Sequence, residues 1–274
     1  ASFLVALFSI RLFEVRFAER ARRARELAFV LLGGAIIVLL GLTRSSQVIE
    51  GRTIEISVIQ TNVPQDNRMA WTFDQKVEDF RRFAAMTQGA RPSHLIVWPE
   101  TMFPGLSLNA DAIRAEREAG IVYPGGVPTT EFHDALLTLQ KSVGVPMLVG
   151  AIAREGLRID VDDDGRVSVD MDASYNSAFI VQDGEVEPTR YDKLHLTPFG
   201  EVMPLISRWD WLEEKLLALG AAGMSFELEA GRAPTVLTIT RSDELHLFEE
   251  RYATPICFEA TMPGVCRRLV FSGG

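Results

Sequence analysis

Three segments of the chain place a reactive side chain where a strand is expected to end. Glu100 follows the apolar run 94–98 and Pro99, in "HLIVWPET". Because proline cannot donate to a sheet ladder, the chain must leave the sheet at Pro99 and present Glu100 at the sheet's end. Lys193, in "RYDKLHLTPFGE", and Cys257, in "YATPICFE", also follow β-like runs. In chain order the three side chains are a carboxylate, an ammonium group and a thiol.

These three groups together have the chemistry for nucleophilic acyl transfer. The thiolate of Cys257 is the candidate nucleophile. The apolar neighbours expected around Glu100 raise the pKa of its carboxylate towards that of a useful general base. Lys193 can stabilise a developing oxyanion, and the backbone N–H of Phe258 can donate a second hydrogen bond to it. Each residue also has a plainer interpretation: a surface acid, a surface lysine and an inert buried cysteine.

Three further residues accompany this set. Glu201 follows Lys193 by eight residues and is expected to orient it or to act as a second acid–base group. Glu259, two residues after Cys257, is placed with Phe258 as a supporting residue of the same turn. Cys266 is expected to be structural, and a disulfide between Cys257 and Cys266 remains an alternative if the domain is exported.

Composition narrows the classes of function. The chain has 274 residues, a formal net charge of −9, 47% hydrophobic residues and 24% charged residues. This composition supports a sizeable core and argues against a nucleic-acid partner. The four histidines and two cysteines lack zinc spacing, and "DVDDDG" (160–165) lacks the glutamate of a calcium loop. The sequence therefore predicts neither a metal nor a cofactor.

The amino-terminal segment has the pattern of a membrane anchor. Residues 27–43, "LAFVLLGGAIIVLLGLT", carry no charge, and about 17 residues is the lower limit for a span. Arginines crowd the preceding segment, which places that side in the cytoplasm and the following domain outside. We expect residues 1–10 to be the tail of an earlier span and 11–26 a cytoplasmic loop. A buried core helix for 27–43, and a short interfacial helix for 1–10, remain open.

The rest of the chain, 53–274, mixes strand and helix patterns. Strands are expected at 53–60, 94–98, 146–151, 174–182 and within 185–193, followed by 234–240, 245–258 and 268–272. Helices are expected at 73–86, 132–143 and around 205–219. Hairpins are expected to turn at Asp164-Gly165 and at Asp183-Gly184. Early alternation followed by hairpins indicates an α/β fold with a large mixed sheet covered by helices.

The order of Glu100, Lys193 and Cys257 resembles the nitrilase, or carbon–nitrogen hydrolase, superfamily. The resemblance implies that these residues form its Glu-Lys-Cys catalytic set, on an α-β-β-α sandwich domain, with Glu201 as its additional glutamate. The segments "VIQTNVPQDNRMAW", "VWPET", "YDKLHLTPFGEVMP" and "PICFE", placed after a membrane segment, resemble one branch, the apolipoprotein N-acyltransferase family. Phe258 stands where a tyrosine is common in that branch. The chain ends where the family's fold continues, so the domain is expected to be truncated.

That resemblance implies a membrane-bound acyltransferase. The enzyme would move a fatty acyl chain from a phospholipid, through a thioester on Cys257, to the amino-terminal amine of a diacylglyceryl-cysteine lipoprotein. Its partners would be the phospholipid donor, the apolipoprotein acceptor and the bilayer. It would lie in the bacterial inner membrane, with the catalytic domain on the periplasmic side. The alternative enzyme is a membrane-tethered amidase that hydrolyses a C–N bond, and the alternative from another class is an inactive anchored binding domain.

Overall fold

The chain folds into two compact units, residues 1–53 and 54–274, in the computed structural model. The structure describes residues 2–45, 53–62, 71–90, 92–162, 164, 166–197, 201, 228–242 and 247–272. Each unit is considered by itself.

The first unit is a single helix, α1 (Ser2–Ser45). The expected loop over 11–26 is therefore wrong as secondary structure, because those residues are helical. The physical reason lies in their composition: the segment is rich in Ala, Arg and Glu and has no Gly or Pro to interrupt a helix. Arg22 and Glu26, one turn apart, form an exposed ion pair of 3.1 Å that adds a small local stabilisation.

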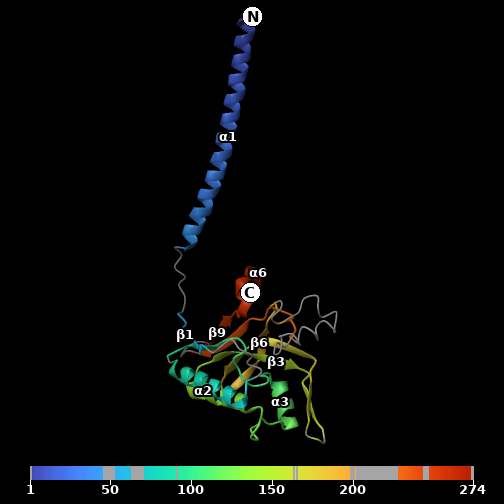
Figure 1. Ribbon diagram of the computed structural model, residues 1–274. Helices are drawn as coiled ribbons and strands as arrows, with labels where there is room; N and C mark the ends of the chain where they lie inside the picture. Colours follow the sequence, from blue (N-terminus) through green and yellow to red (C-terminus); the bar gives the residue numbers. More distant parts are fainter. Residues whose placement is uncertain are drawn as a thin grey trace. The chain divides into compact units, whose positions relative to one another are not determined.

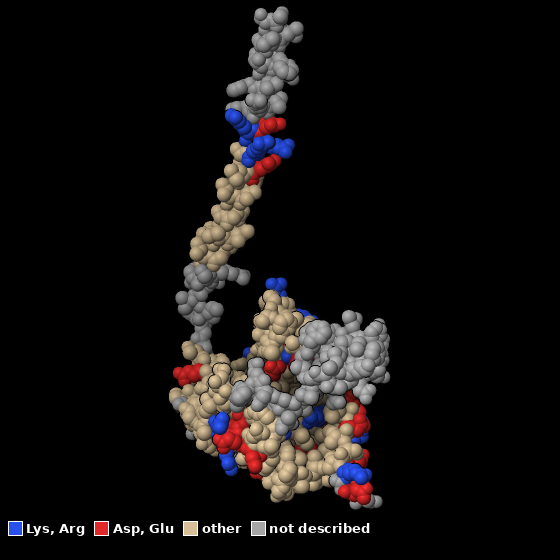
Figure 2. All heavy atoms as spheres, in the orientation of Figure 1, with Lys and Arg blue, Asp and Glu red and all other residues tan. Residues whose placement is uncertain are grey.

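Within α1, one stretch is long and apolar enough to cross a membrane, Arg22–Thr43, with a mean hydropathy of 2.3. Its large aliphatic side chains from Leu27 to Leu42 are exposed. Figure 2 shows a band of Lys, Arg, Asp and Glu side chains on the helix, followed by a stretch without charge. The composition of this helix therefore fits the expected span over 27–43.

The second unit is built on a mixed five-stranded sheet with the order β1-β2-β3-β6-β7. Its strands are β1 (Ile56–Val58), β2 (Leu95–Trp98), β3 (Met147–Glu155), β6 (Ala173–Gln182) and β7 (Glu185–Asp192). The first three strands are parallel, and β3-β6 and β6-β7 are antiparallel. The predicted mixed sheet is thus confirmed.

Helices cover one face of this sheet (Figure 1). They are α2 (Phe73–Gly89), α3 (Ala110–Ala119) and α4 (Glu131–Val143). Helix α2 begins at a capping box in which Thr72 and Gln75 satisfy each other's backbone N–H. Phe83 of α2 and Leu136 of α4 are fully buried with Trp98 of the sheet in one apolar cluster. Helix α3, which the sequence pattern did not reveal, ends at Gly120 with a φ of 62°.

A β-hairpin and a short helix, both late in the chain, cover the other face of the sheet (Figure 1). They are β8 (Leu237–Ser242), β9 (Leu247–Tyr252) and α6 (Pro263–Phe271), with the 3-10 turn η2 (Cys257–Thr261) between β9 and α6. Leu237 and Leu269 are buried there against the sheet residue Ile180. The expected strand at 268–272 is wrong: its residues belong to α6, which Pro263 starts at the favoured first helical position.

The hairpins lie where turn chemistry predicts them. Strands β6 and β7 are joined at Asp183 and Gly184, which both have positive φ, as a type I′ turn requires. Strands β4 (Arg158–Val161) and β5 (Val167–Asp170) form an exposed hairpin, whose expected turn residue Gly165 lies outside the described residues. The helix expected around 205–219 also lies outside them.

Candidate active site

Glu100 lies directly beyond the end of β2, where the chain crosses over β3. This crossing depends on Gly150 of β3: a Cβ added there would overlap the carbonyl oxygen of Pro99 and lie 2.8 Å from Cα of Glu100. Thr101, the next residue, has a φ of 49°, which is uncommon for a side chain branched at Cβ. The backbone at Glu100 is therefore held tightly against the sheet, while its side chain remains 31% exposed.

Lys193 lies directly after β7, and its side chain is only 1% exposed. Its Nζ donates to Oε1 of Glu100 at 3.2 Å and to Oε2 of Glu201 at 2.7 Å. Burial alone would lower the pKa of Lys193, but the hydrogen bonds and negative charges of Glu201 and Glu100 outweigh it, and the pKa is raised. The ammonium is therefore charged at neutral pH.

Asn176, on β6, connects the two carboxylates. Its Nδ2 donates to Oε1 of Glu100 at 2.6 Å and to Oε1 of Glu201 at 2.8 Å. Burial would raise the pKa of Glu201, but hydrogen bonds from Lys193, the Thr197 N–H and Asn176 overcome it, so the pKa is lowered. Both Glu201 and Lys193 are thus ionised. The sequence pattern did not identify Asn176 as a residue of this site.

Cys257 is the first residue of η2 and has a φ of 52°. A thiol on a residue held in the left-handed region is a constrained presentation of the kind that clusters at functional sites. Partial burial, the charge of Glu100 and a hydrogen bond to Glu100 raise the pKa of the thiol, whereas Lys193 and the Phe258 N–H oppose this rise. The raised pKa favours the neutral thiol, and Glu100 is the neighbouring carboxylate able to accept its proton.

Both cysteines are free thiols, so the alternative Cys257–Cys266 disulfide is not formed. The sulfur of Cys266 lies 3.6 Å from the carbonyl oxygen of Glu259 and is half-buried at the start of α6. This position fits the expected structural role of Cys266. The ring of Phe258 is 43% exposed beside the nucleophile.

Glu259 is fully buried and braces the turn that carries the thiol. Its Oε2 accepts from the Tyr191 hydroxyl and from the Ile256 N–H, both at 2.8 Å. Its Oε1 accepts from the N–H groups of residues 194 and 195 at 2.7 and 3.0 Å. Four donors satisfy the hydrogen-bonding capacity of this buried carboxylate, and they connect η2 to the end of β7. Burial and the neighbouring Glu259 together raise the pKa of Tyr191 well above its usual range.

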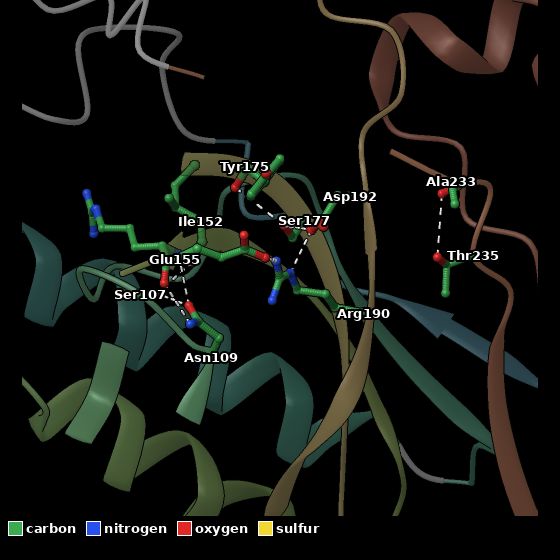
Figure 3. A network of polar contacts seen from close by, with 11 residues as sticks. Ser107, Asn109, Ile152, Glu155, Tyr175, Ser177, Arg190, Asp192, Ala233 and Thr235 are labelled. Atoms are coloured by element: carbon green, nitrogen blue, oxygen red, sulfur yellow. Dashed lines mark hydrogen bonds and ion pairs between the residues drawn. The ribbon is translucent and has the colours of Figure 1, made fainter. Parts of the chain in front are cut away.

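Polar contacts outside the reactive groups hold the same strand ends in place (Figure 3). Asp192, adjacent to Lys193, accepts from the Ser177 hydroxyl at 2.6 Å and from Arg190 at 2.7 Å. Arg190 also pairs with Glu155 at the end of β3, at 2.6 Å. These contacts tie β7 to β6 and β3 on the side of the sheet edge where Lys193 emerges.

The sequence-predicted residues therefore converge. The structure brings Glu100, Lys193 and Glu201 into direct contact and places Cys257 close enough for Glu100 and Lys193 to shift the pKa of its thiol. It places Glu259 beneath the thiol's turn rather than among the charged groups. Two residues that the sequence pattern missed, Asn176 and Tyr191, complete the arrangement. Together these groups have the chemistry for a carboxylate, Glu100, to abstract a proton from the Cys257 thiol beside the fixed cation of Lys193.

Comparison with known proteins supplies a family context. No family model matches the chain. Among curated proteins it is similar to the apolipoprotein N-acyltransferases of Methylococcus capsulatus (30% identity over 67% of this chain), Chlorobaculum tepidum (32% over 80%) and Geobacter metallireducens (23% over 99%). The chain spans 30%, 38% and 45% of the length of these relatives, respectively.

Solved structures similar to the chain include two nitrilase-type proteins. The NitN amidase from Nesterenkonia sp. AN1 has a TM-score of 0.41 and 11% identity, over 81% of this chain and 64% of that one. The carbon–nitrogen hydrolase from Helicobacter pylori G27 has a TM-score of 0.33 and 13% identity, over 65% and 45% of the two chains.

Proposed function

Because this chain is a relative of the apolipoprotein N-acyltransferases, we propose that it supplies the reacting groups for acyl transfer from a phospholipid to the amino terminus of a lipoprotein. The acceptor amine is that of a diacylglyceryl-modified cysteine. The observation that most supports this proposal is the contact of the Cys257 thiol with Glu100, beside the buried, charged Lys193. Glu100, Lys193 and Cys257 are the proposed catalytic residues.

The first half-reaction forms an acyl-enzyme. Glu100 takes the proton from Cys257 Sγ, and the thiolate attacks the ester carbonyl carbon of the phospholipid. The carbonyl π electrons move to oxygen, where Lys193 and the Phe258 N–H stabilise the charge. When the tetrahedral intermediate collapses, the C–O ester bond breaks and Glu100 returns its proton to the leaving lysophospholipid. A thioester on Cys257 remains.

The second half-reaction transfers the acyl group to nitrogen. The neutral α-amine of the lipid-modified cysteine attacks the thioester carbonyl, which again passes through an oxyanion beside Lys193. Glu100 accepts a proton from the attacking nitrogen and delivers it to the departing sulfur of Cys257. The products are an amide and the free thiol. Two steps of lower barrier replace one direct attack of an amine on an ester.

The membrane arrangement is part of the same proposal. Residues 27–43 span the bacterial inner membrane, with the arginines before them in the cytoplasm and residues 53–274 on the periplasmic side. The apolar composition of Arg22–Thr43 supports a span. Both proposed substrates are lipid-anchored, so a membrane tether keeps the site at the surface where they reside. In this arrangement residues 11–26 lie on the cytoplasmic side, and residues 2–10 precede them on the same continuous helix.

Intact-mass spectrometry after incubation with phospholipid vesicles tests the proposal. We expect the mass of the protein to increase by one acyl chain on Cys257. This increase should disappear when a diacylglyceryl-cysteine peptide is added, and the peptide should be converted to its N-acyl form. Cys257→Ser removes the adduct, and Cys266→Ser, which removes the other thiol, retains it. Absence of an adduct under conditions of turnover defeats the covalent route. Hydrolysis of small amides without transfer to the peptide identifies the chain as an amidase instead.

A further inference from the structure

The charged groups of the site form a closed ring of hydrogen bonds. Lys193 bonds Glu100 and Glu201, and Asn176 bonds the same two carboxylates from the other side. Lys193 and Asn176 both use Oε1 of Glu100, at 3.2 and 2.6 Å. The second oxygen of Glu100 is therefore left to receive a proton.

The chemistry of the two carboxylates determines which end of the Asn176 amide faces them. An ionised carboxylate only accepts hydrogen bonds, so the NH₂ group must point to Glu100 and Glu201. The carbonyl Oδ1 then points elsewhere, and among the described residues it has no hydrogen-bond partner although it is buried. An unpaired buried carbonyl is unfavourable. The side chain of Asn176 is thus oriented so that both N–H donors form hydrogen bonds while its carbonyl oxygen forms none.

Like charges at close range disfavour double ionisation, so two neighbouring carboxylates need donors or a cation between them if neither is to hold a proton. A shared proton would leave Glu100 unable to accept one from Cys257. An amide NH₂ has two donors and no charge, so it stabilises both ionised carboxylates at once. A leucine of similar size at this position would remove both donors.

We propose that Asn176 is a positioning residue that holds the carboxylates of Glu100 and Glu201 through its two N–H donors, favours the ionised form of Glu201 and turns the second oxygen of Glu100 toward the thiol. Asn176 does not touch the reacting atoms in this role but acts through Glu100. This inference rests on the proposed function in one respect, namely that Glu100 is the base for Cys257.

The test compares Asn176→Leu with a matched control, Gln140→Leu. Gln140 is another buried amide with two hydrogen bonds, to the Val145 carbonyl and from the Gly184 N–H, and it lies on α4 away from the carboxylates. Folding of each variant is checked by circular dichroism. If Asn176→Leu does not fold, Asn176→Ser, which keeps a single donor, takes its place and is expected to give smaller changes in the same direction.

Two measurements are made on each variant. The first is titration of ¹³C-carboxyl-labelled glutamates by NMR, with Glu201 assigned from Glu201→Gln. We expect Glu201 to titrate at higher pH in Asn176→Leu than in the wild type and Gln140→Leu. The second is the rate at which p-nitrophenyl butyrate acylates Cys257 as a function of pH. We expect the plateau rate to fall roughly 10- to 100-fold in Asn176→Leu, in line with the cost of misplacing a reacting group, and its acidic limb to move to higher pH.

The outcomes separate the two claims. If Glu201 titrates as in the wild type and the acidic limb does not move, the role of Asn176 is overturned, whatever the acyl acceptor. A fall in the acylation rate in Gln140→Leu equal to that in Asn176→Leu also overturns it, since any buried amide would then suffice. If the titration and the acylation change as expected but wild-type protein never transfers an acyl chain to the lipopeptide, the inference stands and the proposed function fails.

Discussion

The Glu259 carboxylate, two residues after Cys257, accepts a hydrogen bond of 2.8 Å from the phenol of Tyr191, two residues before Lys193. Three backbone N–H groups, from both sides of this junction, point at the same carboxylate. One buried side chain thus sets the separation between the turn that presents the thiol and the strand end that presents the ammonium group.

We expect Glu259→Gln to destabilise the domain by about 2–3 kcal/mol. The NH₂ group of glutamine would point at hydrogen-bond donors that now donate to the carboxylate. The remaining bonds would also weaken, because hydrogen bonds to a charged group are stronger than bonds to a neutral amide. Tyr191→Phe removes a single donor and should cost about 1–2 kcal/mol. Urea denaturation followed by circular dichroism measures both free energies of unfolding. If Glu259→Gln unfolds at the same urea concentration as the wild type, Glu259 is not the brace.

Gly150→Ala is expected to displace Glu100 because its Cβ would overlap the backbone of Pro99. The overlap is with main chain rather than with a flexible side chain, so we expect a loss of about 1–3 kcal/mol in stability and at least a tenfold slower acylation of Cys257. Gly89→Ala serves as the control, because a Cβ there meets open space at the end of α2. Equal acylation rates in the two variants would contradict the crossing constraint.

Glu100→Gln should change two properties of Cys257 in opposite directions. The negative charge of Glu100 is one of the causes that raise the pKa of the thiol, so its removal lowers that pKa and speeds alkylation by iodoacetamide near pH 8. Loss of the base should slow acylation by an ester about 10²- to 10⁴-fold. Both rates are measured in a Cys266→Ser background, which leaves one thiol. Slower alkylation at this pH would show that Glu100 does not act on the thiol electrostatically.

Stability should depend on pH through Glu116, a buried carboxyl of α3. Burial raises its pKa above the usual value of 4.5, although Thr129, Arg154 and Arg117 oppose the rise. A carboxyl whose folded-state pKa is raised favours the folded state while it is protonated. Stability from this group is therefore present at or below about pH 4.5 and is lost as the pH rises through the folded-state pKa.

Glu116→Gln should remove that loss and raise the melting temperature at pH 7 relative to the wild type. Each unit of pKa difference corresponds to about 1.4 kcal/mol. Thermal unfolding from pH 4 to pH 8 measures the effect, with Glu131→Gln on exposed α4 surface as the control. A parallel pH dependence in wild type and Glu116→Gln would exclude Glu116 as its source.

The sequence revealed those parts of the site that depend on local chemistry. Pro99 after a buried run placed Glu100 correctly at a strand end, and Asp183-Gly184 predicted its hairpin because both positions need positive φ. Glu100 and Lys193 follow the ends of β2 and β7 as expected, and Glu201 pairs with Lys193, which fits one of the two roles expected for it. These features need only neighbours in sequence to be recognised.

The features that were missed depend on distant neighbours or on ambiguous runs. Asn176 lies in a strand whose other residues are typical of strands. Asparagine is depleted in strands, so its presence there was the available signal for a special role. Its partner Glu100 is 76 residues away, which local patterns do not reveal. The run 268–272 is short and apolar, which periodicity cannot assign, whereas Pro263 marked the start of a helix. The loop expected at 11–26 depended on a separate span at 1–10, whereas the residues of this segment favour a continuous helix.

The hydrogen-bonded ring has a consequence for how the protein acquires its reactivity. Its bonds join residues 76, 93 and 25 positions apart, and the thiol comes from a still later segment. Contacts of such separation require closure of long loops, which is slow compared with the formation of helices or hairpins. During synthesis, and in any partly folded state, the thiol is therefore an ordinary one without a base or a cation beside it. On the proposed mechanism, chemical competence would appear only with the completed sheet.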